Sequence, residues 1–576
     1  MNVFFRYFKP YALSFLAAVV LLSAQAYCDL ALPDFMSDII NKGITAGNTA
    51  YIFKTGMQML GIALISACCT ILVGFIGARM AAGISRNLRQ DVFTKIESFS
   101  STEMEKYSTS SLITRTTNDI TQIQQLIVMM VRLVIYAPIM GIGGVLHALE
   151  KDSSMSWIIA LAVALMLILI GSIMVVVMPR FQFVQKLVDR LNLVTREGLD
   201  GTLVIRAFNT QKFEEKRFDK VNARLTQTNL FVNRVISGMM PTMMLIMNLT
   251  SLLIVWVGSK AVSGFKMQVG DMMAYMQYVM QIISAFLMMA VMFILIPRAA
   301  VSIRRVVEIL KTEPAITDPE VSADIPQAPK GVVEYRDVSF RYPEADEEVL
   351  HNITFTALPG QTTAFIGATG SGKSTLVNLL PRFYDVTEGE ILVDGQNIKN
   401  WPLHKLRDII GFVPQKGILF SGTIGSNLRY GKRDADDGEV EAAAETAQAM
   451  EFIDSKPRRF QTAIAQGGGN VSGGQKQRLS IARALIKKAP VNVFDDSFSA
   501  LDFKTDAKLR GALKEKTGNS TTLLVAQRIS TIMNADQIIV LNHGEIAGKG
   551  THRELMENCT VYREIALSQL SEEELK

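Results

Sequence analysis

The stretch Gly367-Ala368-Thr369-Gly370-Ser371-Gly372-Lys373-Ser374-Thr375 decides how the second half of this 576-residue chain is interpreted. It matches the pattern G-x-x-x-x-G-K-[S/T]. An apolar run typical of a strand, Thr363–Ile366, precedes it, and a helical pattern from Thr375 to Leu380 follows. In this strand–loop–helix context, backbone N–H groups turn inward around phosphates and the helix N-terminus adds partial positive charge. The stretch therefore predicts a nucleotide site.

Individual side chains of this loop have predicted roles. Lys373 is expected to reach the β- and γ-phosphates of the nucleotide, and the hydroxyl of Ser374 is expected to hold Mg²⁺. The other residues predicted to bind ATP here are Gly367, Thr369, Gly370, Ser371, Gly372 and Thr375. The alternative is a glycine-rich turn that binds no ligand. A chain of this length seldom contains the full pattern by chance, so we favour the nucleotide site.

The composition points to a membrane protein with several domains. The chain is 49% hydrophobic, contains 29 Met, and has a mean hydropathy of +0.23, which is high for a soluble protein. Its net charge is only +5, so nothing indicates a nucleic-acid partner. The four cysteines show no spacing typical of disulfides or metal sites, and we expect them to be reduced.

Six long segments of the first half contain no Asp, Glu, Lys or Arg. A bilayer core requires about 20 apolar helical residues, and buried helices of soluble proteins seldom stay free of charge for so long. The first and third segments are short, so their helices are expected to continue past Asp29 and Arg132. The segments are Tyr11–Cys28, Thr55–Ala78, Leu133–Leu149, Ser153–Pro179, Val235–Ser259 and Met272–Pro297. The sequence predicts six transmembrane helices.

Lys and Arg counts predict the orientation of these helices. The connection from Arg79 to Arg132 carries seven, and that from Arg180 to Arg234 carries eleven; the other three carry two, one and two. By the positive-inside rule, both termini and the two long connections are cytoplasmic, which places the chain in the cytoplasmic (inner) membrane. The aromatic and basic segment Met1–Pro10 predicts an interfacial helix, with a cleaved secretory signal as the alternative.

The two long connections keep helical apolar spacing among many charges, so the membrane helices are expected to project into the cytoplasm. At their tips, Glu97–Tyr107 and Asn209–Phe218 are amphipathic stretches that could lie against another domain. The alternative is a solvated helix face.

The last span contains the candidates for a substrate cavity. Gln277 and Gln281 lie four residues apart on one helix face, and methionines, whose flexible side chains suit varied apolar ligands, surround them. Ordinary helix packing is the alternative. Asp29 and Arg132 are candidates for gate or packing ion pairs. The candidate cavity residues are Met273, Met276, Gln277, Met280 and Gln281.

The second half reads as a separate α/β domain. The segment Thr312–Lys330 contains four prolines and is typical of a linker. From Gly331 onward, short strand patterns at Val332–Tyr335, Val338–Arg341 and Ile391–Val393 alternate with helical ones. The predicted organisation is a membrane α-helical domain over residues 1–311, a linker over 312–330 and an α/β P-loop nucleotide-binding domain over 331–576.

Several further motifs give this domain a family resemblance. Ser472-Gly473-Gly474-Gln475 and the helix pattern after it resemble the signature helix of ATP-binding cassette (ABC) transporters. Val491–Asp495 resembles the Walker B strand, Ser499–Asp502 the D-loop and Gln415 the Q-loop. Six spans with long cytoplasmic extensions ahead of this domain resemble an ABC exporter half-transporter, and the resemblance covers nearly the whole chain.

The resemblance implies ATP and Mg²⁺ as cofactors and a second half-transporter as partner. Tyr342 would stack on adenine, Ser374, Gln415 and Asp495 would hold the metal ion, and Asp502 would contribute to the catalytic site. The signature residues Ser472, Gly473, Gly474 and Gln475 would face the ATP held by the opposite subunit. Two cassettes would then enclose two ATP molecules, and one chain could complete neither site.

Two positions depart from the family pattern on the same side of this sandwich. The residue after the Walker B aspartate is usually Glu, but here it is Asp496, whose carboxylate falls short by about 1.5 Å, an error that can cost about a hundredfold in rate. The expected switch histidine is Gln527, which cannot titrate near neutral pH. The pair predicts a site that hydrolyses ATP slowly, in a heterodimer whose other chain carries Glu and His. A slow homodimer is the alternative.

The sequence as a whole predicts a subunit of an ATP-driven exporter working by alternating access. As in the multidrug-type exporters that it resembles, the expected cargo is a hydrophobic or amphipathic compound, and membrane lipid is the surrounding partner. A lipid or peptide exporter of the same architecture and an ATP-gated membrane regulator remain as alternatives. Six spans exclude a soluble ABC protein that acts on nucleic acid.

Overall fold

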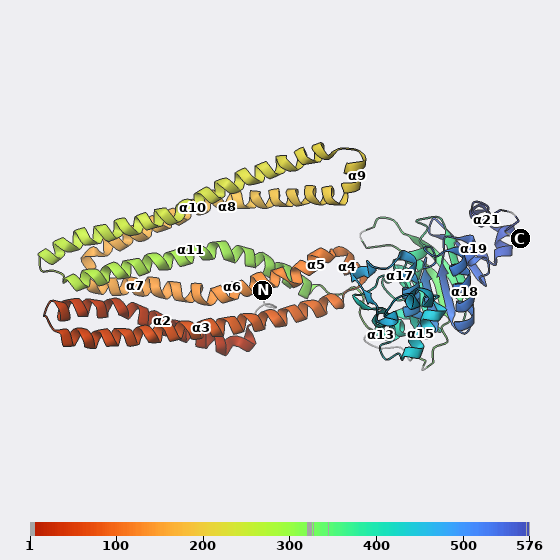
Figure 1. Cartoon of the computed structure of the whole chain (residues 1–576), viewed down its shortest axis with the longest axis horizontal. Coiled ribbons are helices and arrows are strands. Elements are labelled where there is room, and N and C mark those ends of the chain that lie inside the picture. Colours follow the sequence, from red (N-terminus) through yellow and green to blue (C-terminus); the bar gives the residue numbers. More distant parts are fainter. Residues whose placement is uncertain (1–5, 320–324, 327, 344, 572, 575–576) are drawn as a thin grey trace. The chain divides into compact units, whose positions relative to one another are not determined.

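The computed structural model describes residues 6–319, 325–326, 328–343, 345–571 and 573–574. These residues form two compact units, one of residues 6–97 and 109–312 and one of residues 98–108 and the described residues from 313 onward (Figure 1). Residues 1–5, and with them half of the predicted interfacial helix, lie outside the described part. Residues 6–8 form a turn, and a short 3₁₀ helix, Lys9–Tyr11, follows.

The first unit is built from long helices that pair as hairpins (Figure 1). Its helices in chain order are α2 (Ala12–Asp38), η2 (Ile39–Ile44), α3 (Thr49–Glu97), α5 (Thr109–Thr116), α6 (Asn118–Met130), η3 (Val131–Tyr136), α7 (Ala137–Lys151), η4 (Ser153–Met155), α8 (Ser156–Asp200), α9 (Thr202–Ala207), α10 (Gln211–Ser263) and α11 (Val269–Lys311). In the described residues, six helical stretches are long and apolar enough to cross a membrane, and some of them join several of these elements. They are Lys9–Ile44, Thr49–Glu97, Thr109–Lys151, Ser153–Asp200, Gln211–Ser263 and Val269–Met289. The prediction of six spans is confirmed.

The helices extend beyond their charge-free segments, as predicted for the first and third. The helix α2 continues past Asp29 to Asp38, and the third span runs through Arg132 without a break in helical structure. Many large apolar side chains of this unit are exposed in the isolated chain, Leu13 at 79% among them. Exposure on this scale suits a lipid or partner surface and is costly in water.

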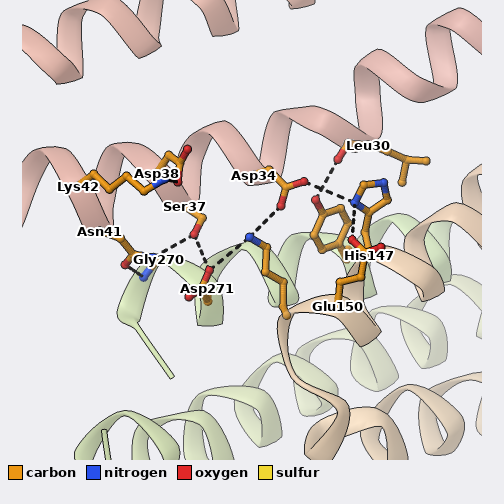
Figure 2. A network of polar contacts seen from close by, with 12 residues as sticks. Leu30, Asp34, Ser37, Asp38, Asn41, Lys42, His147, Glu150, Gly270 and Asp271 are labelled. Carbon is orange, nitrogen blue, oxygen red and sulfur yellow. Dashed lines mark hydrogen bonds and ion pairs between the residues drawn. The ribbon is translucent and has the colours of Figure 1, made fainter. Parts of the chain in front are cut away.

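Polar side chains tie three helices together where the hairpins turn. The end of the unit that contains the turns at residues 39–48, 152–155 and 264–268 is called the short-turn end. Residues of α2, α7 and α11, among them Asp34, His147 and Asp271, come together there (Figure 2). The Nζ of Lys151, the last residue of α7, lies 3.0 Å from Asp34 Oδ1 and 3.3 Å from Asp271 Oδ1. His147 Nδ1 lies 3.5 Å from Asp34 Oδ2, and its ring stacks on Tyr278.

The backbone approaches closely at the same place. Ser37 donates to Asp271 at 2.8 Å, and the Gly270 N–H donates to Asn41 Oδ1 at 2.8 Å (Figure 2). A Cβ atom on Gly270 would come within 2.5 Å of the Ser37 carbonyl oxygen, so only glycine fits. A hydrogen bond, tight backbone packing and the ion pairs that Lys151 of α7 makes with both helices therefore join α2 to α11.

Removing the charge of Lys151 should loosen this contact. Lys151→Met leaves Asp34 and Asp271 facing each other without their shared cation, and leaving partly buried acceptors without their donor costs about 1–3 kcal/mol. We expect the apparent melting temperature of the purified full-length chain to fall by several degrees. Lys42→Met is the matched control, because Lys42 pairs with Asp38 while its side chain is 62% exposed. Equal melting temperatures of the two variants would contradict the role given to Lys151.

The two predicted loop tips differ in the structure. Residues 98–108 belong to the second unit and contain the helix α4 (Ser101–Lys106). There the Ala315 N–H donates to Glu103 Oε1 at 3.1 Å, and the Tyr384 hydroxyl donates to Glu105 Oε1. The first predicted stretch does lie against the other domain.

The second tip was predicted a few residues too late. Its short helix is α9, Thr202–Ala207, between a break at Gly201 and a left-handed Asn209 with φ of 54°. Residues 211–218 instead begin the long helix α10. Leu203 is 82% exposed, so the expectation that this tip covers another domain stays a prediction.

The second unit is the α/β domain. Besides α4, its elements are β1 (Val333–Phe340), β2 (Leu350–Ala357), β3 (Thr362–Gly367), α12 (Lys373–Leu379), β4 (Glu388–Val393), β5 (Gln396–Asn397), η5 (Ile398–Asn400), α13 (Leu403–Asp408), β6 (Ile410–Val413), β7 (Gly422–Thr423), α14 (Ile424–Leu428), α15 (Asp437–Thr446), α16 (Met450–Asp454), η6 (Arg459–Gln461), β8 (Ala463–Ile464), η7 (Gln466–Gly468), α17 (Gly473–Leu485), β9 (Val491–Asp495), α18 (Phe503–Lys516), β10 (Thr521–Val525), α19 (Ile529–Ile532), β11 (Gln537–Asn542), β12 (Glu545–Gly550), α20 (His552–Asn558) and α21 (Thr560–Leu567).

The central sheet places the glycine-rich loop among buried strands. Its order is β12-β11-β3-β10-β9-β6, and the strands from β11 to β6 run parallel. Parallel strands buried on both faces read as continuous apolar runs, and β9 is buried at all five positions. The carboxyl ends of β3, β9 and β10 therefore meet at one edge, where ligands bind in open parallel sheets.

A second sheet has the order β2-β1-β4-β5. Its strand β1 differs from the prediction. Val332–Tyr335 and Val338–Arg341 were expected to be two strands, but they form the single strand β1. The pairing of β1 with β2 shifts register between Tyr335 and Val338, and Asp337 has φ of 49°. A bulge thus interrupts the sequence alternation without ending the strand.

Candidate ATP-binding site

The glycine-rich loop joins β3 to α12 with a backbone that excludes larger residues. Gly370 and Gly372 have φ of 84° and 93°, a region that glycine favours. A Cβ atom on Gly372 would lie 2.6 Å from a side-chain carbon of Leu350. Residue 372 must therefore be glycine for the loop to keep this backbone.

Lys373 is held within the loop that it closes. Its Nζ donates to the carbonyl oxygens of Gly367 at 2.8 Å and Ala368 at 2.7 Å. Burial lowers the pKa of the Lys373 ammonium, while the carboxylates of Asp496 and Asp495 oppose that shift. A buried cation in a ring of backbone groups fits the phosphates of ATP.

Ser374 and Asp495 form the part of the site that fits a metal ion. The Ser374 hydroxyl donates to Asp495 Oδ1 at 2.8 Å, and Asp495 is the last residue of β9. Burial raises the pKa of Asp495, and the bond from Ser374 opposes that shift. A hydroxyl and a carboxylate oxygen are hard ligands of the kind that Mg²⁺ prefers.

The two residues that depart from the family pattern contact each other. The Gln527 side chain donates to Asp496 Oδ2 at 2.8 Å, and Gln415 donates to the same oxygen at 3.3 Å. Asp496 has φ of 46°, and its N–H donates to the Val525 carbonyl oxygen at 3.1 Å. The Asp496 carboxylate is thus held by two neutral amide groups from different loops.

A cavity of about 310 Å³ lies between the glycine-rich loop and the side chains of Gln415, Asp496 and Gln527. It is lined by Val349, Thr369, Gly370, Gly372, Lys373, Ser374, Thr375, Gln415, Asp496, Val525 and Gln527. A larger cavity of about 1040 Å³ in the same unit is lined by none of the residues predicted to bind ATP. Chemistry favours the smaller cavity, because its lining contains the lysine, hydroxyl and carboxylate groups that a nucleotide and its metal ion require.

Five predicted residues lie outside the lining of this cavity, namely Tyr342, Gly367, Ser371, Asp495 and Asp502. The Tyr342 hydroxyl is 3.0 Å from Thr375 Oγ1, and its ring packs edge-on against Phe340 and Tyr384. Asp502 caps α18 by accepting the Thr505 N–H at 2.9 Å, and this bond lowers the pKa of Asp502. Stacking on adenine for Tyr342 and a catalytic role for Asp502 stay predictions.

The signature residues do not join the cavity of their own chain. Ser472 caps α17: its Oγ accepts the Gln475 N–H at 3.3 Å, and Gln475 Oε1 accepts the Ser472 N–H at 3.1 Å. Ser472 and Gly473 are exposed, and Gly474 packs against the Ala500 carbonyl oxygen. This exposed helix N-terminus is suited to an anion that another subunit brings.

The sequence analysis missed Gln569, which hydrogen-bonds to the backbone of the loop that contains Gln527. Gln569, after α21, donates to the Gln527 carbonyl oxygen at 2.8 Å and accepts the Ile529 N–H at 2.8 Å. Both bonds go to backbone on either side of Arg528. No local pattern marks such a contact, because Gln569 lies 42 residues from Gln527 in the sequence.

The candidate cavity residues share one face of α11. Met273, Met276, Gln277, Met280 and Gln281 are all half-buried, whereas Tyr275 and Tyr278 on another face are fully buried. Gln281 donates to the Asp29 carbonyl oxygen at 3.1 Å. Asp29 itself accepts bonds from Ser66 and Tyr136, and the side chain of Arg132 lies outside the described residues. The role of this face stays a prediction.

Comparison with known proteins agrees with this geometry. Residues 15–286 match the ABC transporter transmembrane region, and residues 350–499 match the family described as ABC transporter. The chain belongs to the ABC transporters. It is an ABC exporter half-transporter, a multi-pass membrane protein in which a transmembrane domain is fused to an ATP-hydrolysing domain, and ABC exporters work as dimers.

Several relatives cover almost the full chain. The uncharacterized ABC transporter ATP-binding proteins MT1311 of Mycobacterium tuberculosis and YfiB of Bacillus subtilis are each 38% identical over 98% of this chain, and the matches cover 97% and 98% of those proteins. The ATP-dependent lipid A-core flippase of Aromatoleum aromaticum is 31% identical over 100% of this chain and 97% of its own. The structure of a bacterial Atm1-family ABC exporter with ATP bound matches with a TM-score of 0.82, 25% identity and coverage of 98% and 99%.

Proposed function

We propose that this half-transporter is the subunit with the degenerate ATP site in a heterodimeric exporter. The observation that carries the proposal is the contact between Asp496 and Gln527, beside an intact and exposed signature helix start at Ser472. The carboxylate that should orient the attacking water is short and already accepts two amide groups. This site would bind ATP with Mg²⁺ and hydrolyse it slowly, while Ser472 and Gly473 complete the partner's site.

The proposed cargo is a hydrophobic or amphipathic compound, moved outward across the cytoplasmic membrane with both termini on the cytoplasmic side. The half-buried methionine and glutamine face of α11 supports this proposal, because it combines adaptable apolar contacts with a few polar groups. A lipid is the second candidate, since relatives named lipid A-core flippases align along the whole chain.

Hydrolysis by the chain alone tests the degenerate site. Purified and reconstituted without a partner, it should hydrolyse ATP slowly, because each composite site would contain Asp496 and Gln527. Asp496→Glu with Gln527→His should raise this rate about tenfold or more, since a misplacement of about 1 Å can cost a hundredfold. Gln527→His alone serves as the control. Fast turnover by the unaltered chain, insensitive to Asp496→Asn, would contradict the proposal.

The partner is tested by purification of the full-length chain from its native membrane. The expected result is a second half-transporter, with Glu and His at the positions of Asp496 and Gln527, in equal amount. Recovery of this chain alone as a dimer with ordinary ATPase activity would favour a homodimer.

A further inference from the structure

The side chain of Gln569 connects the segment after α21 to the loop of residues 526–528, which joins β10 to α19 and is called the Gln527 loop. Its Nε2 donates to the Gln527 carbonyl oxygen, and its Oε1 accepts the Ile529 N–H, both at 2.8 Å. One side chain therefore fixes the backbone on both sides of Arg528.

The bond to Ile529 replaces a cap that the start of α19 lacks. The residue before this helix is Arg528, whose side chain makes no capping hydrogen bond. The first N–H groups of a helix need acceptors, which Ser, Thr, Asp or Asn usually supply at this position, and an arginine side chain has only donors. Gln569, 40 residues further along the chain, supplies the acceptor instead. The end of the Gln527 loop therefore depends on a distant side chain.

Free space lies behind the Gln527 loop. A cavity of about 480 Å³ is lined by Arg528 and Gln569 among other residues, and it shares Asp496, Val525 and Gln527 with the cavity of the ATP site. Gln527 thus borders both cavities, and the loop has room to recede from the ATP site. Hydrogen bonds, more than packing, must hold it forward.

The other bonds of the Gln527 loop leave its centre free to move. At its start, the Ala526 N–H donates to the Phe365 carbonyl oxygen at 3.2 Å. The Arg528 guanidinium donates to two carbonyl oxygens of the segment after β9, at 3.2 and 3.4 Å, through a long and flexible side chain. The bond from Gln569 instead goes to the backbone carbonyl of Gln527 itself.

The Gln527 amide has the chemistry to recognise a terminal phosphate. An amide nitrogen carries two N–H groups. One of them donates to Asp496 Oδ2 at 2.8 Å, which leaves the second for a phosphate oxygen. Lys373, the residue expected to reach the β- and γ-phosphates, lines the same cavity. Because ADP has no γ-phosphate, a contact between this phosphate and Gln527 would favour ATP over ADP.

We propose that Gln569 is a positioning residue that holds Gln527 toward the γ-phosphate of ATP in this chain's own site. Gln569 lies outside the lining of the ATP cavity and acts through the Gln527 loop. The segment after α21 thereby sets the preference of the site for ATP over ADP. The proposal rests on the function proposed above in one respect, namely that this chain's own site binds ATP.

The test compares two nucleotides that differ in the γ-phosphate. Gln569→Met keeps the length of the side chain and removes both hydrogen bonds. Binding of AMP-PNP, which has a γ-phosphate and resists hydrolysis, and of ADP is measured with Mg²⁺ on the full-length chain in nanodiscs, by displacement of a fluorescent ADP analogue. We expect Gln569→Met to weaken AMP-PNP binding about three- to tenfold, as for the loss of about one net hydrogen bond, and to leave ADP binding unchanged.

Two further variants show whether Gln569 acts through Gln527. Gln527→Ala removes the amide, and in that background Gln569→Met should cause no further loss of AMP-PNP affinity. Such non-additivity is what a double-mutant cycle measures. Gln461→Met is the matched control, because it alters an exposed glutamine of the same domain and should leave the affinity for both nucleotides unaltered. Unchanged ADP binding by each variant shows that the domain remains folded.

The outcomes separate this proposal from that of the ATP site. An equal loss for AMP-PNP and ADP would assign Gln569 to the stability of the domain and overturn its positioning role. Unchanged AMP-PNP binding by Gln569→Met, or the same loss with and without Gln527, would also overturn it. In these three cases the ATP site stands. If the unaltered chain binds neither nucleotide, both proposals are wrong.

Discussion

Gly473→Glu in this chain should reduce ATP hydrolysis and transport by the assembled exporter by at least about a hundredfold. Gly473 is exposed, and a Cβ atom there would meet nothing closer than the Ala500 Cβ at 4.0 Å, so the chain itself tolerates the side chain. The new carboxylate would instead face the phosphates held by the partner. Two like charges about 4 Å apart repel by about 4 kcal/mol at an effective dielectric constant of about 20.

Two comparisons make this result informative. Gly511→Glu adds the same group to α18 in open space and should leave hydrolysis unchanged. Asp496→Asn alters only the chain's own site and should lower hydrolysis modestly if the partner's site supplies most turnover. Steady-state ATPase and vesicle transport are measured for all three variants in one reconstituted complex. Equal losses from Gly473→Glu and Asp496→Asn would mean that both sites act alike, and the heterodimer proposal would be wrong.

Lys373→Ala should weaken ATP binding at the chain's own site by about ten- to a hundredfold, the range expected for losing hydrogen bonds from a charged donor. Lys373 is the cation that lies inside the glycine-rich loop, bonded to Gly367 and Ala368. Removing it leaves the phosphates without their nearest positive charge. Equilibrium binding of a fluorescent ATP analogue to the full-length chain measures the change.

The matched control for this variant is Lys508→Ala on α18, which removes an exposed lysine of the same domain. It should leave nucleotide affinity unaltered. If Lys373→Ala also leaves it unaltered, Lys373 does not bind the phosphates. In the assembled exporter, we expect Lys373→Ala to reduce the number of bound nucleotides from two to one, since the partner's site keeps its own lysine.

The parts of the fold that were predicted correctly depend on short-range patterns. Charge-free runs identify the six spans because lipid tolerates almost no charge, and the apolar run Val491–Asp495 corresponds to β9 residue for residue. The division of β1 into two strands was wrong because a bulge at Asp337 displaces the alternation without ending the hydrogen bonding. The tip helix α9 was placed too late because its boundaries depend on Gly201 and a left-handed Asn209.

In the candidate site, too, the residues that belong to local motifs were predicted, and the contacts between distant residues were not. Lys373, Ser374 and Asp495 follow from motifs that specify their own geometry; Lys373 and Ser374 line one cavity, and Asp495 accepts the Ser374 hydroxyl. Other contacts join residues that are far apart in the sequence. They include the hydrogen bonds from Gln527 to Asp496, from the Ile529 N–H to Gln569 and from Ser66 to Asp29. Such contacts are set by the packing of whole elements, and no pattern within a single segment carries them.

The helix α4 has a consequence for any attempt to work with the ATP-binding half alone. Residues 98–108 are part of its compact unit, and Glu103 and Glu105 accept bonds from the Ala315 N–H and the Tyr384 hydroxyl. A recombinant fragment beginning at residue 313 would lack these two acceptors. The Ala315 N–H and the Tyr384 hydroxyl would then lose their hydrogen bonds to Glu103 and Glu105. The portion of the polypeptide that folds as the motor is therefore not contiguous, and no single cut in the gene can separate it cleanly from the membrane portion.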